Sequence, residues 1–244
     1  MPRKYATISA ETGSDRACQV AGRGLAFGRP PSAAPYKDDS PMKQWSWLAL
    51  FGLCLAAVPA AAQDSEGFTQ LFNGKNLDGF MTHPDDKAVW KVEDGMIVGT
   101  GQAGHLFTYR GDFSDFVYRL HIKISDKGNS GQYFRTKFKK AFPVSGKDGY
   151  EAQINSTGGD RVKSGSLYSL GPIVTDILVP PDTWFVQEVT AKGKHITIKV
   201  NDKVTVDRDI DNPKELFLSG HLAIQQHDPG SKVWIRKVEV KELK

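Results

Sequence analysis

Cysteine is scarce in this chain of 244 residues, which contains only Cys18 and Cys54. The sequence beyond residue 54 can therefore form no internal disulfide and offers no thiol nucleophile. The motifs of several catalytic sites are absent as well: there is no P-loop, no dinucleotide-binding glycine fingerprint, no serine nucleophile elbow, and no His-x-His or His-Glu-x-x-His pair. No cofactor is evident, and a divalent cation would need ligands scattered along the chain.

A second absence concerns helices. From residue 63 to residue 244, no window shows a sustained helical period of 3.6 residues. Short apolar runs recur instead, separated by Gly, Asn and Asp. Residues 116–124 alternate between apolar and polar side chains, as a half-buried strand does, and Asp94-Gly95 between two apolar runs is a hairpin signal. The pattern predicts an all-β sandwich or barrel.

A strong charge of one sign is also absent once the first 62 residues are set aside. The whole chain has 32 Lys and Arg against 28 Asp and Glu, but seven of the basic and four of the acidic residues precede residue 63. Residues 63–244 thus carry 25 basic and 24 acidic side chains, a net charge of +1. Nucleic-acid binding requires a clustered basic surface, so this class of partner is excluded.

The N-terminal part reads as a targeting segment. Met42-Lys43-Gln44 precedes an apolar run over residues 45–58, and Ala60-Ala61-Ala62 follows. This order predicts a signal peptide over residues 42–62, with 1–41 a disordered leader or a gene start placed too far upstream. The run is shorter than the roughly 20 apolar residues of a membrane span, although an N-terminal anchor is the alternative. We expect residues 63–244 to form one periplasmic or secreted domain, with no membrane contact after cleavage.

Polar side chains gather in four strand-like segments. These are 129–135 (NSGQYFR), 149–154 (GYEAQI), 165–168 (GSLY) and 225–228 (QQHD). Because side chains alternate along a strand, Tyr150, Ala152 and Ile154 should share one face, and Glu151 and Gln153 the other. A sheet face that carries Glu, Gln, Arg, His and Tyr suits a polar ligand, with sugar the obvious candidate.

Each of these polar residues also has a plainer interpretation. Glu151 is either a solvent-facing charge or a proton acceptor whose pKa burial raises. Arg135, expected on the same face as Tyr133, either pairs with Glu151 or stabilises an enolate oxygen. His227 is a base, a ligand or a strand-end residue, and Asn129 is a ligand or a turn residue. On the last strand Trp234 shares a face with Arg236, where it is core or a sugar-stacking platform.

The polar segments, taken in order with several other short motifs, match the pattern of a known protein family. Further matches are residues 71–80 (LFNGKNLDGF), 90–99 (WKVEDGMIVG), Trp184, 220–227 and 233–240. Together they span about residues 67–243, and the sequence resembles the 3-keto-disaccharide hydrolase family. Departures from the family pattern occur at Trp184-Phe185, at residues 224–227 (IQQH) and at Arg236-Lys237-Val238. The resemblance implies a concanavalin A-like jelly-roll β-sandwich of two antiparallel sheets.

The resemblance also implies an activity, which is the cleavage of 3-keto-glycosides by elimination and hydration or by net hydrolysis. Either Glu151 or His227 would be the base, and Arg135 would bind the enolate. The substrate-binding residues would be Asn129, Tyr133, Gln153, Tyr168, Gln225, Trp234 and Arg236. A sugar 3-dehydrogenase would have to supply the substrate. The alternatives are a non-catalytic, lectin-like carbohydrate-binding module and a structural or adhesion domain.

Overall fold

The structure of the protein is a computed structural model that describes residues 63–140 and 143–244. The predicted leader (1–41) and signal peptide (42–62) lie outside the described residues. Every regular element within those ranges is a β-strand. No helix in this part of the chain is long and apolar enough to cross a membrane.

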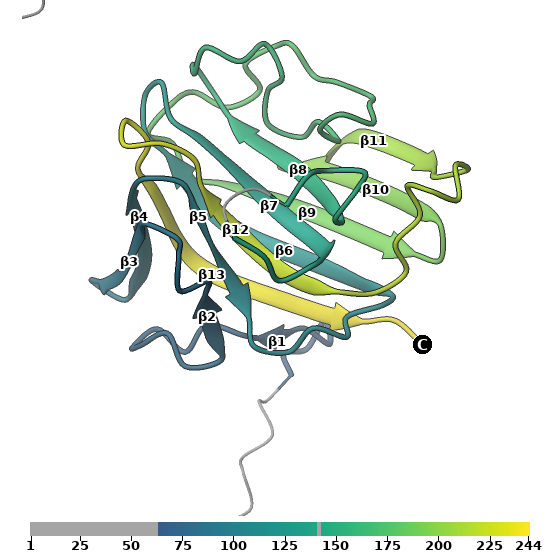
Figure 1. Cartoon of the computed structure of the whole chain (residues 1–244), viewed down its shortest axis with the longest axis horizontal. Helices are drawn as coiled ribbons and strands as arrows, with labels where there is room; N and C mark the ends of the chain where they lie inside the picture. The colour runs from purple at the N-terminus through teal and green to yellow at the C-terminus, as the bar shows by residue number, and fades with distance from the viewer. Residues whose placement is uncertain (1–62, 141–142) are drawn as a thin grey trace, which may run out of the picture. The chain divides into compact units, whose positions relative to one another are not determined.

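In residues 63–140 and 143–244, thirteen strands form two antiparallel sheets (Figure 1). In spatial order the larger sheet contains β11 (Lys203–Asp209), β10 (His195–Val200), β9 (Phe185–Lys192), β6 (Phe116–Ile124), β13 (Val233–Glu242), β4 (Met96–Gly101) and β3 (Ala88–Glu93), while β1 (Thr69–Gln70) pairs with β13. The smaller sheet contains β2 (Phe80–Thr82), β5 (Gly104–Thr108), β12 (His221–Gln226), β7 (Asn129–Thr136) and β8 (Tyr150–Asn155). The predicted all-β sandwich of two antiparallel sheets is confirmed.

The core lies between the two sheets and follows the alternation of the sequence. Along β6, every second side chain from Phe116 to Ile124 is at most 1% exposed. From the smaller sheet, Phe134, Tyr150 and Ile154 are fully buried against this layer. Asp94 and Gly95 both have positive φ and join β3 to β4, which is the geometry of a tight hairpin turn. The strand over 116–124 and this hairpin were both predictable.

The other face of the smaller sheet points away from the core and positions the site. Cross-strand pairing places five side chains in one row on this face: Met81, Phe107, Ala223, Tyr133 and Glu151. Glu151 belongs to the outermost strand of the sheet, β8, and the long connection from β8 to β9 lies beside it at the top of Figure 1. The row is apolar at the β2 end and acidic at the β8 end.

Candidate active site

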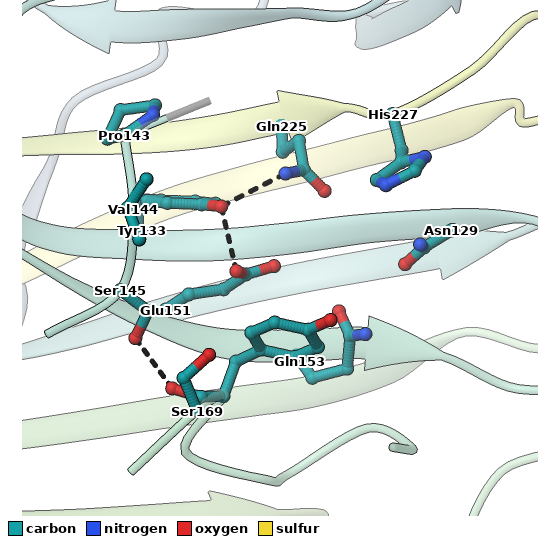
Figure 2. A pocket seen from close by; sticks show the side chains of 11 residues that line it. Asn129, Tyr133, Pro143, Val144, Ser145, Glu151, Gln153, Ser169, Gln225 and His227 are labelled. Atoms are coloured by element: carbon teal, nitrogen blue, oxygen red, sulfur yellow. Dashed lines mark hydrogen bonds between the residues drawn. The ribbon is translucent and has the colours of Figure 1, made fainter. Parts of the chain in front are cut away.

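A pocket of about 200 Å³ opens on the outer face of the smaller sheet, at the acidic end of this row. Strands β7, β8 and β12 form its floor, and the segments 143–145 and 168–169 form its walls. The side chains that line it are those of Asn129, Tyr133, Pro143, Val144, Ser145, Glu151, Gln153, Tyr168, Ser169, Gln225 and His227 (Figure 2). Six of the predicted site residues come together in this pocket with Glu151.

Glu151 is the centre of a buried hydrogen-bond chain. The Tyr133 hydroxyl donates to Glu151 Oε2 over 2.7 Å, and Gln225 Nε2 donates to the Tyr133 hydroxyl oxygen over 3.0 Å (Figure 2). Glu151 is only 5% exposed and Gln225 only 2%. Each member comes from a different strand of the smaller sheet, so the sheet register fixes the orientation of the carboxyl group.

The surroundings of Glu151 shift the pKa of its carboxyl group. Burial raises the pKa of the Glu151 carboxyl to about 8, because a charged carboxylate loses its hydration there. The hydrogen bond from Tyr133 lowers this pKa, and the negative charge of Asp160 raises it. A carboxyl group that titrates close to neutral pH can both accept and return a proton, as general acid–base catalysis requires.

Two amide oxygens in the pocket lack partners. Gln225 Oε1 and Asn129 Oδ1 are buried and accept no hydrogen bond from any group in the described residues. An unsatisfied buried acceptor costs about 1–3 kcal/mol, so such groups normally have a partner. Both residues line the pocket, so each amide could satisfy its oxygen by turning toward a polar ligand there.

Loop residues build the rim. Ser145 Oγ donates to the Tyr168 carbonyl oxygen over 2.7 Å and ties one wall to the other. The Tyr168 hydroxyl donates to Asp160 Oδ2 over 3.1 Å, which holds the tyrosine beside the opening. His227 Nδ1 lies 3.0 Å from Asp228 Oδ2, and its side chain is 40% exposed. Glu151 therefore lies deep in the pocket and His227 near solvent.

Gly131 makes room for the carboxyl group. A Cβ atom at this position would lie 2.5 Å from Glu151 Oε1 and 2.9 Å from the Tyr133 ring. Gly131 pairs with Gln153 of β8, so the missing side chain keeps the floor open between the two strands. This role could not be predicted, because nothing in the run NSGQYFR shows that the glycine faces a carboxylate.

Arg135 is not in the pocket, so its predicted place beside Tyr133 was wrong. Its guanidinium donates to the carbonyl oxygens of Ser114, Gly193 and Phe217 and to Asp115 Oδ1, over 2.6–3.0 Å. The physical reason is a β-bulge: the register of β7 against β12 shifts here, and Arg135 has φ of 47°. A bulge breaks the strict alternation of faces and re-aims the side chain.

Trp234 and Arg236 are also placed away from the pocket, contrary to expectation. Both belong to β13 in the larger sheet, where Trp234 pairs with Val98 and with Lys123. The neighbours Val233 and Ile235 are buried in the core, so Trp234 points to the opposite, outer face of that sheet. The sequence pattern leaves open whether Trp234 lies in the core or on a surface, and it cannot tell which of the two sheets the strand joins.

The loop residues of the site were not foreseen. Pro143, Val144 and Ser145 line one wall, and Asp160 acts on Glu151 through its charge. These residues lie in irregular segments, where no periodicity marks the direction of a side chain. Only their position between the polar strand segments could have suggested them.

The side chains that could ligate a metal ion do not cluster in the described residues. No group of three or more His, Cys, Asp and Glu residues lies close enough to hold a metal ion in ranges 63–140 and 143–244. Within the pocket, Glu151 and His227 are the side chains of these types. They could contribute at most two such ligands to a cation.

Sequence comparison identifies the class. The profile of the 3-keto-alpha-glucoside-1,2-lyase-like domain matches residues 67–241, and the chain belongs to this family. The resemblance found in the motifs is thereby confirmed, and family membership makes the chain a carbohydrate-active protein. A search of curated protein sequences gives no match.

Solved structures agree on the fold. A provisionally assigned glycosyl hydrolase from Parabacteroides distasonis ATCC 8503 is 24% identical, with a TM-score of 0.63, over 75% of this chain and 99% of that one. Carbohydrate binding module CBM66 from Bacillus subtilis is 17% identical, with a TM-score of 0.52, over 67% and 96%. The β-glucanase of Bacillus licheniformis is 12% identical, with a TM-score of 0.53, over 74% and 100%. The jelly-roll sandwich is shared by all three.

Proposed function

We propose that this domain cleaves 3-keto-glycosides at the glycosidic bond, with Glu151 as the base that removes the proton from C2. The observation that carries the proposal is the buried Glu151 carboxyl, whose pKa is raised to about 8 inside a pocket lined by amide and hydroxyl groups. Membership of the lyase-like family supports the 3-keto substrate.

The reaction follows from the chemistry of the ketone. A carbonyl at C3 acidifies the C2–H bond, so a carboxylate can take that proton and leave an enolate. The electron pair then forms the C1=C2 double bond while the C1–O bond breaks, and the leaving group departs as an alcohol once it gains a proton. Addition of water across the double bond gives the free 3-keto-sugar, which is net hydrolysis. A single base is sufficient, unlike the carboxylate pair of ordinary glycosidases.

Tyr133 is the proposed donor to the enolate oxygen, a role that the sequence analysis gave to Arg135. Before the reaction, its hydroxyl hydrogen is directed at Glu151 Oε2. Once Glu151 is protonated, the carboxyl group no longer needs this hydrogen bond, and the Tyr133 hydroxyl is free to turn toward O3. The Gln225 amide, which donates to the Tyr133 oxygen, makes the phenol a stronger donor. As the proton leaves C2, negative charge is lost from Glu151 and appears on O3, and the Tyr133 hydroxyl turns from the first oxygen to the second.

His227 is the proposed proton donor to the leaving group. It lies at the rim, where the aglycone of a bound glycoside would leave, and contacts Asp228. If His227 were the base instead, substitution of His227 would abolish proton removal from C2. If His227 is the proton donor, its substitution slows departure of the leaving group instead. The effect should be smallest for substrates whose leaving group needs no proton.

Export and the supply of substrate belong to the same proposal. The signal-peptide pattern over 42–62 supports a periplasmic or secreted location. A 3-keto-glycoside forms only when C3 of a glycoside is oxidised, so a sugar 3-dehydrogenase is the expected upstream enzyme.

The test is incubation of the protein with a 3-keto-glucoside, with and without a chelator, followed by mass analysis of the products. We expect the aglycone together with a sugar product that either lacks or contains one added water. If activity is lost with chelator and restored by a divalent cation, the reaction requires a bound cation. Binding of the sugar without any cleavage would favour the lectin-like module, and neither binding nor cleavage would refute the proposal.

A further inference from the structure

A cluster of aromatic and basic side chains lies on the outer face of the larger sheet, the sheet opposite the pocket. It consists of Trp184, Trp234, Lys123, Lys232 and Arg236, and we call it the cation–indole patch. Lys123 Nζ lies 4.2 Å from the Trp234 ring centroid and 5.5 Å from that of Trp184. Lys232 Nζ lies 4.9 Å from Trp234, and Arg236 Cζ lies 4.8 Å from Trp184.

The strands hold this arrangement in place. Trp234 of β13 pairs directly with Lys123 of β6. Trp184 directly precedes β9, whose first residue, Phe185, pairs with Ile122 of β6, so Trp184 lies next to Lys123. The register of β13 shifts between Ile235 and Lys237, and the bulge there leaves Arg236 exposed. Three members lie on paired strands, and Trp184 and Lys232 directly precede β9 and β13, so the backbone positions of the patch are fixed by the sheet.

The three cations of the patch lack acidic partners. In the described residues, no carboxylate lies within ion-pair distance of Lys123, Lys232 or Arg236. The contrast with the rest of the same sheet face is clear: Arg119 pairs with Glu188, Lys199 also pairs with Glu188, and Lys237 pairs with Glu239. The patch is therefore a local positive field on a domain that is otherwise nearly neutral.

The density of cation–π contacts sets the patch apart. Energetically significant contacts of this kind occur about once per 70–80 residues in proteins. By distance alone, four of the eight contacts in the described residues fall among these five side chains. The indole rings hold the cations in defined positions, which reduces the entropy that each would lose on binding an anion.

We propose that the cation–indole patch binds an acidic polysaccharide, whose carboxylate or sulfate groups pair with the three cations while its sugar rings pack against the indoles. Three charges are too few for a nucleic-acid stripe. They also fall short of the 4–8 clustered basic residues typical of anionic-membrane binding. This activity is independent of the pocket. The two sites lie on opposite sheets, so the domain can hold an acidic glycan while the pocket stays open.

The test uses the full chain and a defined probe, an oligomer of polygalacturonate, with binding measured by calorimetry at two salt concentrations. The double variant K123Q/R236Q should bind at least about tenfold more weakly, and with a smaller salt dependence, since two of three ion pairs are lost. W184A/W234A should also weaken binding. The matched control K75Q/K214Q removes two exposed lysines elsewhere and should bind as the wild type does.

Several results would overturn the proposal. These are an absence of binding by the wild type, an equal loss in the control variant, or tighter binding to vesicles of anionic phospholipid than to the oligomer. Thermal unfolding of each variant separates lost binding from lost folding. Binding of neutral dextran with the same affinity would also contradict the role of the cations.

Discussion

At the scale of single residues, the site depends on one carboxyl group kept out of water. Glu151 could be predicted from alternation alone: Tyr150, Ala152 and Ile154 are fully buried in the core, and Glu151 and Gln153 line the pocket, as the pattern requires. Its depth and its contact with Tyr133 could not be predicted, because they depend on the pairing of β8 with β7.

The raised pKa of Glu151 has a consequence for stability. In the unfolded chain its carboxyl titrates near 4.5 and in the folded protein at about 8, so between these values the folded state holds a proton that the unfolded state has lost. Rising pH therefore destabilises the fold through this window, by about 1.4 kcal/mol per pH unit and at most about 5 kcal/mol in total. We expect Glu151→Gln to be more stable than the wild type at pH 9 but similar at pH 5, by urea unfolding. Equal stability at both pH values would contradict a buried, protonated Glu151.

Asp160 provides a second prediction at this scale. Its negative charge raises the pKa of Glu151, and its carboxylate accepts a hydrogen bond from Tyr168. Asp160→Asn keeps an acceptor for Tyr168 but removes the charge, so the pKa of Glu151 should fall. The rising limb of the pH–kcat/KM profile should then shift to lower pH, with kcat at high pH little changed. An unchanged profile would show that Asp160 does not act on the base.

At the scale of the elements, register decides which side chains meet. β8 follows strict alternation, and its two faces were predicted correctly. β7 does not, because the bulge at Arg135 turns that side chain from the pocket toward the ends of neighbouring strands. A bulge at a non-glycine residue leaves no pattern in the sequence, so the error at Arg135 could not have been avoided by counting residues.

Arg135 is accordingly predicted to be structural. It is among the largest fully buried side chains of the described residues, and it ties the segments at Ser114, Gly193 and Phe217 together. Arg135→Met should lower the free energy of unfolding by at least about 3 kcal/mol, since three carbonyl oxygens each lose a donor at a cost of about 1–3 kcal/mol. Molecules that remain folded should cleave substrate at the wild-type rate. If the variant loses cleavage but not stability, Arg135 does have the catalytic role that the sequence predicts.

Gly131, also on β7, allows a test of how closely the pocket floor fits the Glu151 carboxyl group. In Gly131→Ala the added methyl group would meet Glu151 Oε1 at 2.5 Å, so the carboxyl group must move. A displacement of about 1 Å can cost about 100-fold in rate, and we expect kcat to fall by that order. Gly159→Ala is the matched control, because nothing lies within 4 Å of the added atom there. Equal activity of the two variants would show that Gly131 does not set the geometry.

At the scale of the whole molecule, the sandwich has two outer faces with different chemistry. The smaller sheet carries the pocket, and the larger sheet carries the cation–indole patch. The sequence indicates that Trp234 and Arg236 share a face, but the order of strands in space is set by pairings between distant segments. The fold class followed from local patterns, whereas the assignment of each strand to a sheet did not.

The position of the chain in the cell gives a prediction at this scale. If residues 42–62 are a signal peptide, the exported protein should begin at Gln63. Intact mass measurement of protein from the periplasmic or extracellular fraction should give the mass of residues 63–244. Recovery of a form that retains Met42 at its N-terminus would favour a membrane anchor instead.

The central claim is that Glu151 removes the proton from C2. The most direct measurement uses a 3-keto-glucoside deuterated at C2. It records the rate of cleavage and the mass of the sugar product. The account predicts a primary isotope effect, loss of the deuterium from the eliminated sugar, and no cleavage by Glu151→Gln. A product that keeps its deuterium, formed at an unchanged rate, would contradict it.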